Sequence, residues 1–188
     1  MDRIIPLVTA KDEKELDFTL SALVSYGLNC AEITLRTPYG TEGIRRAREK
    51  FPAMNIGAGT VLTKAQCRAA LDAGAQFVVS PGLSEEVAKE CFKRDVMYFP
   101  GCVTPTEIMR AMEMGIRVVK FFPASVYGGL TALKALSEPF GGVKFFPTGG
   151  VNEDNADEYL ACDFIYAVGG SSFTKAALAK ARARNNKE

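Results

Sequence analysis

The fold of this chain is constrained most strongly by a regular alternation of short apolar runs with helical patterns. The apolar runs suit buried strands, and they recur about every 20 to 26 residues, which leaves room for a strand, a helix and two short loops. They begin near Ile4, Cys30, Ile56, Phe77, Met97, Val118, Val143 and Phe164. Strands that alternate with helices form a parallel sheet, and eight such units favour an α/β fold of the closed (β/α)8 TIM-barrel type. An open doubly wound sheet is the alternative.

Helix signals lie in the intervals between these runs. Helical patterns cover residues 13–26, 41–50, 64–73 and 85–93. Glycine, the usual residue after a helix end, follows three predicted helices, at Gly27, Gly74 and Gly115. Thr104 reads as an N-cap, with Pro105 at the first helical position and Glu107 completing a capping box.

Length and charge predict one domain over residues 1–188 that acts on small molecules. With 47% apolar residues, the chain can fill the core of a single barrel. No apolar stretch approaches 18 residues, and the sequence has no charged-then-apolar leader. The net charge is +1 with both signs mixed, so we expect neither a nucleic-acid nor a membrane partner.

Two absences limit the chemistry. The sequence has no histidine, the commonest general base and metal ligand. Its five cysteines show no Cys-x-x-Cys spacing, which predicts reduced thiols in a cytoplasmic protein. No acidic cluster indicates a metal site, so we expect no metal and no cofactor. Catalysis must then rest on lysine, glutamate, arginine and threonine side chains.

Lys120 is the strongest catalytic candidate. It lies in the run RVVKFFPA, residues 117–124, which reads as a strand buried on both faces. Burial disfavours a charged amine, and a neutral amine can attack a carbonyl, so the first hypothesis is a Schiff-base lysine. The alternative is a strand lysine whose ammonium group extends to water. Lys144 occupies the same phrase, VKFFP, but it lies about 13 Å from the end of its strand, whereas catalytic groups gather at the carboxyl ends.

The second strand carries polar residues at every other position. Glu32, Thr34 and Arg36 share one face, and the apolar residues between them suit the helix layer, so the polar trio should line the barrel interior. The planar fork of Arg36 suits a substrate carboxylate, and Glu32 suits a proton shuttle for the lysine. A structural salt bridge between Glu32 and Arg36 is the alternative.

Loops after the third, seventh and eighth strands complete the predicted site. Thr60 ends a glycine-rich third strand, NIGAGTV, and could complete a carboxylate site. Gly149-Gly150 and Gly169-Gly170 directly follow the last two strands, where barrels often bind a phosphate through backbone N–H groups and a helix N-terminus. The predicted substrate is therefore a small phosphorylated oxo-acid.

A series of motifs, taken in order, resembles one enzyme family. The motifs are EITLRT (32–37), GAGTV (57–61), SPG (80–82), KFFPA (120–124), PTGG (147–150) and GGS (169–171). They resemble the 2-dehydro-3-deoxy-6-phosphogluconate (KDPG) aldolases, also called 4-hydroxy-2-oxoglutarate (KHG) aldolases, from Ile4 to about Ala176. The resemblance implies a class I, metal-independent aldolase on a (β/α)8 barrel, normally a homotrimer.

The resemblance also implies roles for single residues. It makes Lys120 the Schiff-base residue and Glu32 the proton shuttle. It places Arg36 and Thr60 on the pyruvate carboxylate. The remaining substrate-binding positions are Pro81 and Phe122, which would shape the pocket, and Thr148, Gly149, Gly150, Gly170 and Ser171 at the phosphate end.

The implied reaction is cleavage of KDPG to pyruvate and glyceraldehyde 3-phosphate, with KHG cleaved to pyruvate and glyoxylate. Cleavage of the galactonate epimer of KDPG, or a phosphosugar-binding barrel without turnover, remains an alternative. The sequence departs from the family at two places. It starts almost at the first strand, where many members carry a preceding helix, and it has Thr9 where some members have an arginine.

Overall fold

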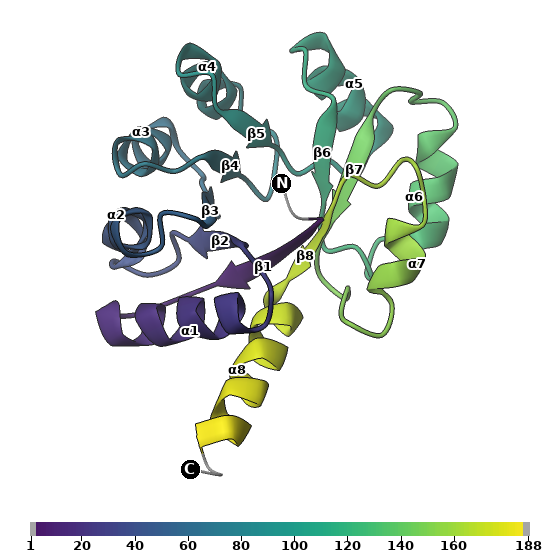
Figure 1. Ribbon diagram of the computed structural model, residues 1–188. Helices are drawn as coiled ribbons and strands as arrows, with labels where there is room; N and C mark the ends of the chain where they lie inside the picture. Colours follow the sequence, from purple (N-terminus) through teal and green to yellow (C-terminus); the bar gives the residue numbers. More distant parts are fainter. Residues whose placement is uncertain (1–2, 186–188) are drawn as a thin grey trace.

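The computed structural model describes residues 3–185, in which eight strands and eight helices alternate along the chain (Figure 1). Residues 1–2 and 186–188 of the predicted domain lie outside the described residues. The strands are β1 Ile4–Val8, β2 Cys30–Thr34, β3 Asn55–Gly59, β4 Phe77–Val79, β5 Met97–Phe99, β6 Val118–Phe121, β7 Lys144–Pro147 and β8 Val168–Gly170. The helices are α1 Glu13–Ser25, α2 Gly40–Lys50, α3 Lys64–Asp72, α4 Glu85–Lys93, α5 Pro105–Glu113, α6 Gly129–Ser137, α7 Ala156–Leu160 and α8 Ser171–Asn185.

The predicted strand positions are confirmed for seven strands and wrong for the eighth. The run that begins at Phe164 does not enter a ladder until Val168. Its first residues instead form a turn, in which Ile165 donates its N–H to Cys162, and they touch β7 through a single bridge from Ile165 to Phe145. A short apolar run cannot reveal where ladder pairing starts, because the partner strand decides it.

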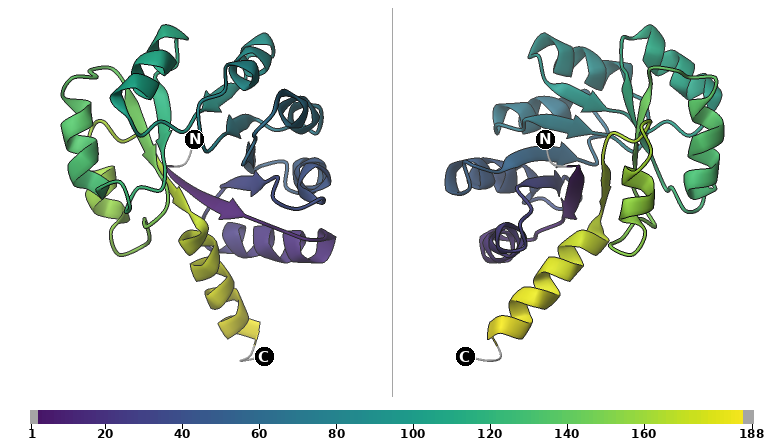
Figure 2. Two further views of the ribbon diagram at one scale, coloured as in Figure 1. Left: turned by 180° about the vertical axis from the view of Figure 1, so that it is seen from behind. Right: turned by 45° about the vertical axis from the view of Figure 1, so that its right-hand side comes forward.

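The strands form a curled parallel sheet whose outer side carries the helices (Figures 1 and 2). One ladder has the order β5-β4-β3-β2-β1-β8, and a second joins β6 to β7. Single parallel bridges link the two ladders, from Gly101 to Lys120 on one side and from Thr148 to Gly169 on the other. The structure thus shows a curled parallel sheet made of a six-stranded and a two-stranded ladder that meet at isolated bridges, and the expected closed eight-stranded ladder is not continuous.

Two apolar clusters fill the protein on opposite faces of the sheet. The larger one lies between strands and helices and includes Ile33, as the period-two pattern predicts. The smaller one contains Cys30, Phe77, Phe99 and Phe146, and the ring of Phe99 meets those of Phe77 and Phe146 edge-on at 5.9 and 5.7 Å. Side chains of a strand alternate between its two faces, so Glu32 lies on the same face as Cys30. It lies directly above this aromatic layer, towards the carboxyl ends of the strands.

Local signals in the sequence define the helix ends. The three predicted stop glycines adopt left-handed backbone angles, with φ of 87°, 95° and 82° at Gly27, Gly74 and Gly115. Thr104 caps α5 through the predicted capping box. These contacts need only neighbouring residues, which is why the sequence predicts them well.

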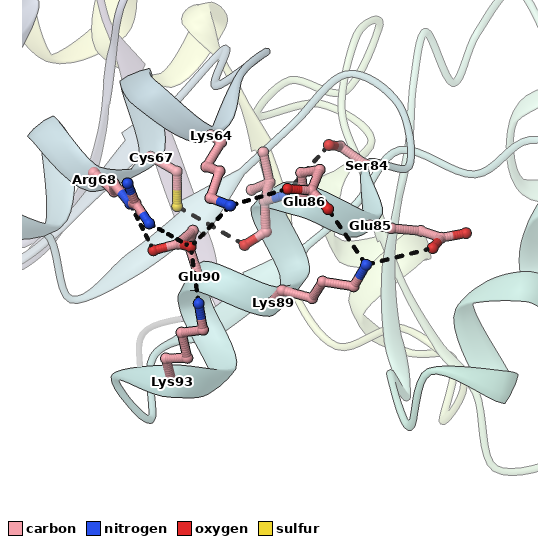
Figure 3. A network of polar contacts seen from close by, with 10 residues as sticks. Lys64, Cys67, Arg68, Ser84, Glu85, Glu86, Lys89, Glu90 and Lys93 are labelled. Carbon is pink, nitrogen blue, oxygen red and sulfur yellow. Dashed lines mark hydrogen bonds and ion pairs between the residues drawn. The ribbon is translucent and has the colours of Figure 1, made fainter.

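Helices α3 and α4 are tied together by charged groups (Figure 3). The carboxylate of Glu90 is almost fully buried and accepts two hydrogen bonds from Arg68, while Lys64 and Lys93 complete its ion pairs. Arg68 holds the pKa of Glu90 at about 2. None of the five cysteines, all of which lie among the described residues, forms a disulfide. Among residues 3–185, no helix is long and apolar enough to cross a membrane.

Candidate active site

A cavity of about 250 Å³ opens at the carboxyl ends of the strands. Eight of the predicted site residues line it: Arg36, Lys120, Phe122, Thr148, Gly149, Gly150, Gly170 and Ser171. Of the other three, Glu32 contacts Lys120 and Thr60 contacts Arg36. Pro81 is exposed, but its carbonyl packs closely over Gly101, the residue bridged to Lys120. The structure therefore brings ten of the eleven predicted residues together at one end of the sheet, whereas Pro81 does not line the cavity.

Lys120 is buried at the floor of this cavity. Its side chain comes from the third residue of β6 and is about 6% exposed. The Nζ atom lies 5.3 Å from the centre of the Phe122 ring and 6.0 Å from that of Phe146. Lys144, in the identical VKFFP phrase, is the exposed first residue of β7 and borders a separate hollow with Arg3 and Asp163. Position along the strand separates the two lysines, as predicted.

Glu32 faces the same interior space. Its side chain is about 1% exposed, and its Oε1 lies 3.5 Å from Nζ of Lys120. Neither carboxylate oxygen has a hydrogen-bond partner within the described part of the chain. A proton can therefore pass between the carboxyl and the amine without breaking another hydrogen bond of either oxygen.

Arg36 does not form the salt bridge with Glu32 that was the structural alternative for these two residues. Its Nε donates a hydrogen bond of 2.9 Å to Oγ1 of Thr60, and the ion pair of Glu32 is with Lys120 instead. Thr60 has a φ of 56°, a left-handed angle that a β-branched residue rarely adopts, and this turns its hydroxyl towards the arginine. Thr34, the third polar residue of the β2 face, is buried and hydrogen-bonds to Thr9 at 2.8 Å.

The opposite wall of the cavity is made of backbone. Gly149 and Gly150 have φ of 83° and 88°, and a Cβ on Gly150 would lie 2.4 Å from Ser125, so both the angle and the space require glycine. Helix α8 begins at Ser171, which directs its free N–H groups and positive dipole end at the cavity. Oγ1 of Thr148 is buried there without a hydrogen-bond partner among the described residues. This wall can bind an anionic group through N–H and hydroxyl donors.

Four further residues line the cavity that sequence reasoning did not single out: Leu7, Val151, Asn152 and Ser172. The last three belong to the same two glycine loops as the predicted phosphate-binding positions and directly follow them, so position in these loops was the signal that could have found them. Leu7 lies two residues beyond Ile5 on β1, and Ile5 belongs to the smaller apolar cluster. In the sequence, only the period-two alternation of the strand indicates that Leu7 faces the barrel interior. No group of three or more histidine, cysteine, aspartate or glutamate residues suited to a metal occurs among residues 3–185.

The fold and the site define an α/β protein with a parallel sheet whose pocket, at the carboxyl ends of the strands, is built around a buried lysine and its carboxylate partner. Within that class, the chain belongs to the KDPG and KHG aldolase family, whose family model matches residues 1–186.

Individual relatives agree with this assignment. The 2-dehydro-3-deoxy-phosphogluconate aldolase of Treponema pallidum is 44% identical over 169 residues, which are 90% of this chain and 80% of that protein. The KHG/KDPG aldolase of Escherichia coli K12 is 38% identical over 89% of this chain and 79% of its own length. The structure of the KDPG aldolase of Legionella pneumophila, with pyruvate captured as a covalent carbinolamine intermediate, superposes with a TM-score of 0.87 at 35% identity, over 94% of this chain and 93% of that one.

Proposed function

We propose that this protein is a class I aldolase that cleaves KDPG to pyruvate and glyceraldehyde 3-phosphate, and KHG to pyruvate and glyoxylate. The observation that carries the proposal is the buried side chain of Lys120, about 6% exposed, whose amine lies in a cavity at the carboxyl ends of the strands with a carboxylate oxygen 3.5 Å away. Membership of a family whose relatives carry these names supports the same reaction.

The first half of the proposed mechanism forms a Schiff base. As the oxo-acid enters the cavity, a proton passes from the Lys120 ammonium to Glu32, whose Oε1 lies 3.5 Å from Nζ. The neutral amine adds to the C2 carbonyl and gives a carbinolamine. Glu32 then donates a proton to the departing hydroxyl, water leaves, and an iminium ion forms between Lys120 and C2.

The second half breaks the carbon–carbon bond. The iminium accepts the electron pair of the C3–C4 bond as a base removes the proton of the C4 hydroxyl, which becomes the aldehyde. Glyceraldehyde 3-phosphate leaves and an enamine remains on Lys120. Protonation of the enamine at C3 and addition of water release pyruvate and regenerate the amine, and Glu32 is the group placed to relay these protons.

The remaining predicted residues would hold the substrate. Arg36, oriented by Thr60, is proposed to bind the C1 carboxylate. Thr148, Gly149, Gly150, Gly170 and Ser171 are proposed to bind the phosphate. Phe122 lies against the Lys120 amine and would, with Pro81, give the pocket its shape.

Borohydride trapping tests the proposal directly. Reduction in the presence of pyruvate should attach a pyruvyl group to Lys120, detected by peptide mass spectrometry, and Lys120→Ala should abolish the adduct. Lys144→Ala is the matched control, since this lysine shares the local sequence but is exposed, and that variant should be trapped as fully as the wild type. An adduct on Lys144 would overturn the assignment of Lys120 as the Schiff-base residue, and no adduct at all would favour a phosphosugar-binding barrel without turnover.

Substrate preference needs a comparison of rates. If the glycine loops and α8 bind a phosphate, KDPG should have a much higher kcat/KM than KHG, and equal values would contradict a phosphate site. The phosphogalactonate epimer differs from KDPG at one hydroxyl, so the same assay of pyruvate release should include it as the alternative substrate.

We further propose that residues 1–188 form one closed (β/α)8 barrel domain, and that the protein is a cytoplasmic homotrimer that needs no cofactor. Hydrogen bonds on both sides of Lys120 support closure between β5 and β6, since its N–H donates to Pro100 at 2.7 Å and its carbonyl accepts from Cys102 at 2.8 Å. Val126 and Tyr127, which are 75% and 50% exposed, are apolar positions suited to a subunit contact. Light scattering of the purified protein measures the oligomeric state.

A further inference from the structure

The side chain of Glu32 lies across strand β3 in a space left by a missing side chain. In the ladder between β2 and β3, Glu32 pairs with Gly57 and Thr34 pairs with Gly59. A Cβ built on Gly59 would lie 2.2 Å from Oε1 of Glu32, 2.5 Å from its Cγ and 2.7 Å from its Cδ. The glutamate therefore leans towards the carboxyl end of the sheet, and its carboxylate occupies the volume that any side chain at Gly59 would need.

From this overlap we infer that Gly59 is a positioning residue for proton transfer, an inference that rests on the proposed role of Glu32. Its lack of a side chain lets the carboxylate lie flat across β3 and reach within 3.5 Å of the Lys120 amine. Gly59 is the last residue of β3 and does not have a left-handed φ, so backbone conformation does not require glycine there. What an alanine would change at this position is the space available to Glu32.

The carboxylate has little else to hold it in place. Neither of its oxygens has a hydrogen-bond partner among the described residues, and the Lys120 amine is the charged group within ion-pair distance. A methyl group on residue 59 would occupy the position of the carboxylate, so the carboxylate must rotate away. No hydrogen bond from residues 3–185 opposes this movement. The amine of Lys120 is held by a different strand, so it stays in the cavity.

Gly57 provides a matched comparison on the same strand and the same face. A Cβ there would lie 2.1 to 2.3 Å from three atoms of the Phe77 ring, its nearest neighbours, which belong to the aromatic layer beneath the site. An alanine at Gly57 therefore meets the Phe77 ring first and disturbs the packing of the core, whereas an alanine at Gly59 meets Glu32 first. The two glycines separate a general packing defect from the displacement of one catalytic group.

A kinetic double-mutant cycle tests the inference with KDPG cleavage as the assay. Glu32→Gln should lower kcat by about 10² to 10⁴, the usual scale for acid–base catalysis, and Gly59→Ala should lower it by at least about tenfold but by no more than Glu32→Gln does. The double variant should be no more than about threefold slower than Glu32→Gln, because the carboxylate that the added methyl group displaces is already gone. KM should change less than kcat in Gly59→Ala, since Arg36 and the phosphate loops are not displaced. The rate of borohydride trapping should fall, while its final extent at Lys120 should not.

Two results would overturn the inference. One is a Gly59→Ala variant with a kcat within about threefold of the wild type, and the other is a double variant whose two losses multiply. The outcome also separates this inference from the proposed function. Full activity in Glu32→Gln would remove Glu32 from the mechanism, whereas an impaired Glu32→Gln beside an active Gly59→Ala would refute only the role of Gly59.

Thermal unfolding keeps the test decisive if Gly59→Ala folds poorly. In the Glu32→Ala background the space is empty, so adding Gly59→Ala should leave Tm unchanged, whereas in the wild type it should lower Tm. Equal losses of Tm in both backgrounds would show that the added methyl group clashes with something other than Glu32. Gly57→Ala should lower Tm in both backgrounds and keep kcat within about threefold of the wild type.

Discussion

Replacing Lys120 with methionine should destabilise the protein strongly, because it leaves the Glu32 carboxylate buried without an opposite charge. Two unit charges 3.5 Å apart interact by about 5 kcal/mol at the effective dielectric of about 20 that suits protein sites. Removal of one partner from a buried pair typically costs about 3 to 5 kcal/mol. Methionine retains most of the lysine stem, so little packing is lost. We expect the free energy of unfolding, measured in urea at pH 7, to fall by about 3 to 5 kcal/mol.

Two controls decide whether the buried charge is the cause. Lys144→Met alters the same VKFFP phrase at an exposed position and should change the unfolding free energy by no more than about 0.5 kcal/mol. The double variant Glu32→Met with Lys120→Met removes both charges, and it should recover most of the loss or exceed the wild type. A Lys120→Met variant as stable as the wild type, or a double variant as unstable as the single one, would refute the reasoning.

Three other predictions concern single contacts. Thr60→Val removes the hydroxyl that accepts from Arg36 but keeps the branched shape, so KM for KDPG should rise about tenfold with kcat less affected, as steady-state kinetics would measure. Glu90 has its pKa held at about 2 by Arg68, so the stability it adds is complete above about pH 4.5 and is lost as the pH falls towards 2. The stability difference between the wild type and Glu90→Gln should therefore shrink over that range in acid unfolding curves, and a constant difference would contradict the pairing. Thr104→Ala breaks the capping box of α5 and should lower the unfolding free energy by about 1 kcal/mol.

Much of the fold follows from interactions between near neighbours, and the sequence is informative there. The alternation of apolar runs and helical patterns predicts the order of strands and helices, and the boundaries of α1 to α4 agree with prediction to within one residue. The caps at Thr104 and Gly27 depend on a few adjacent residues only. Lys120 could be preferred over Lys144 because distance along a strand is itself a property of the sequence.

Contacts between strands were decided by tertiary structure. The sequence left the partner of Glu32 open between Arg36, just after β2, and Lys120 on β6, and only the curl of the sheet brings the lysine within 3.5 Å. The same holds for the bond between Thr9 and Thr34, for the late start of β8 and for the isolated bridges that link the two ladders. The sequence indicates which face of its strand each side chain occupies. The register and curvature of the sheet determine which residue of a neighbouring strand lies opposite that side chain, and both are set by the packing of the whole core. Gly59 illustrates the difference: the sequence shows a small residue, and only the structure shows that the Glu32 carboxylate occupies the space a side chain would need there.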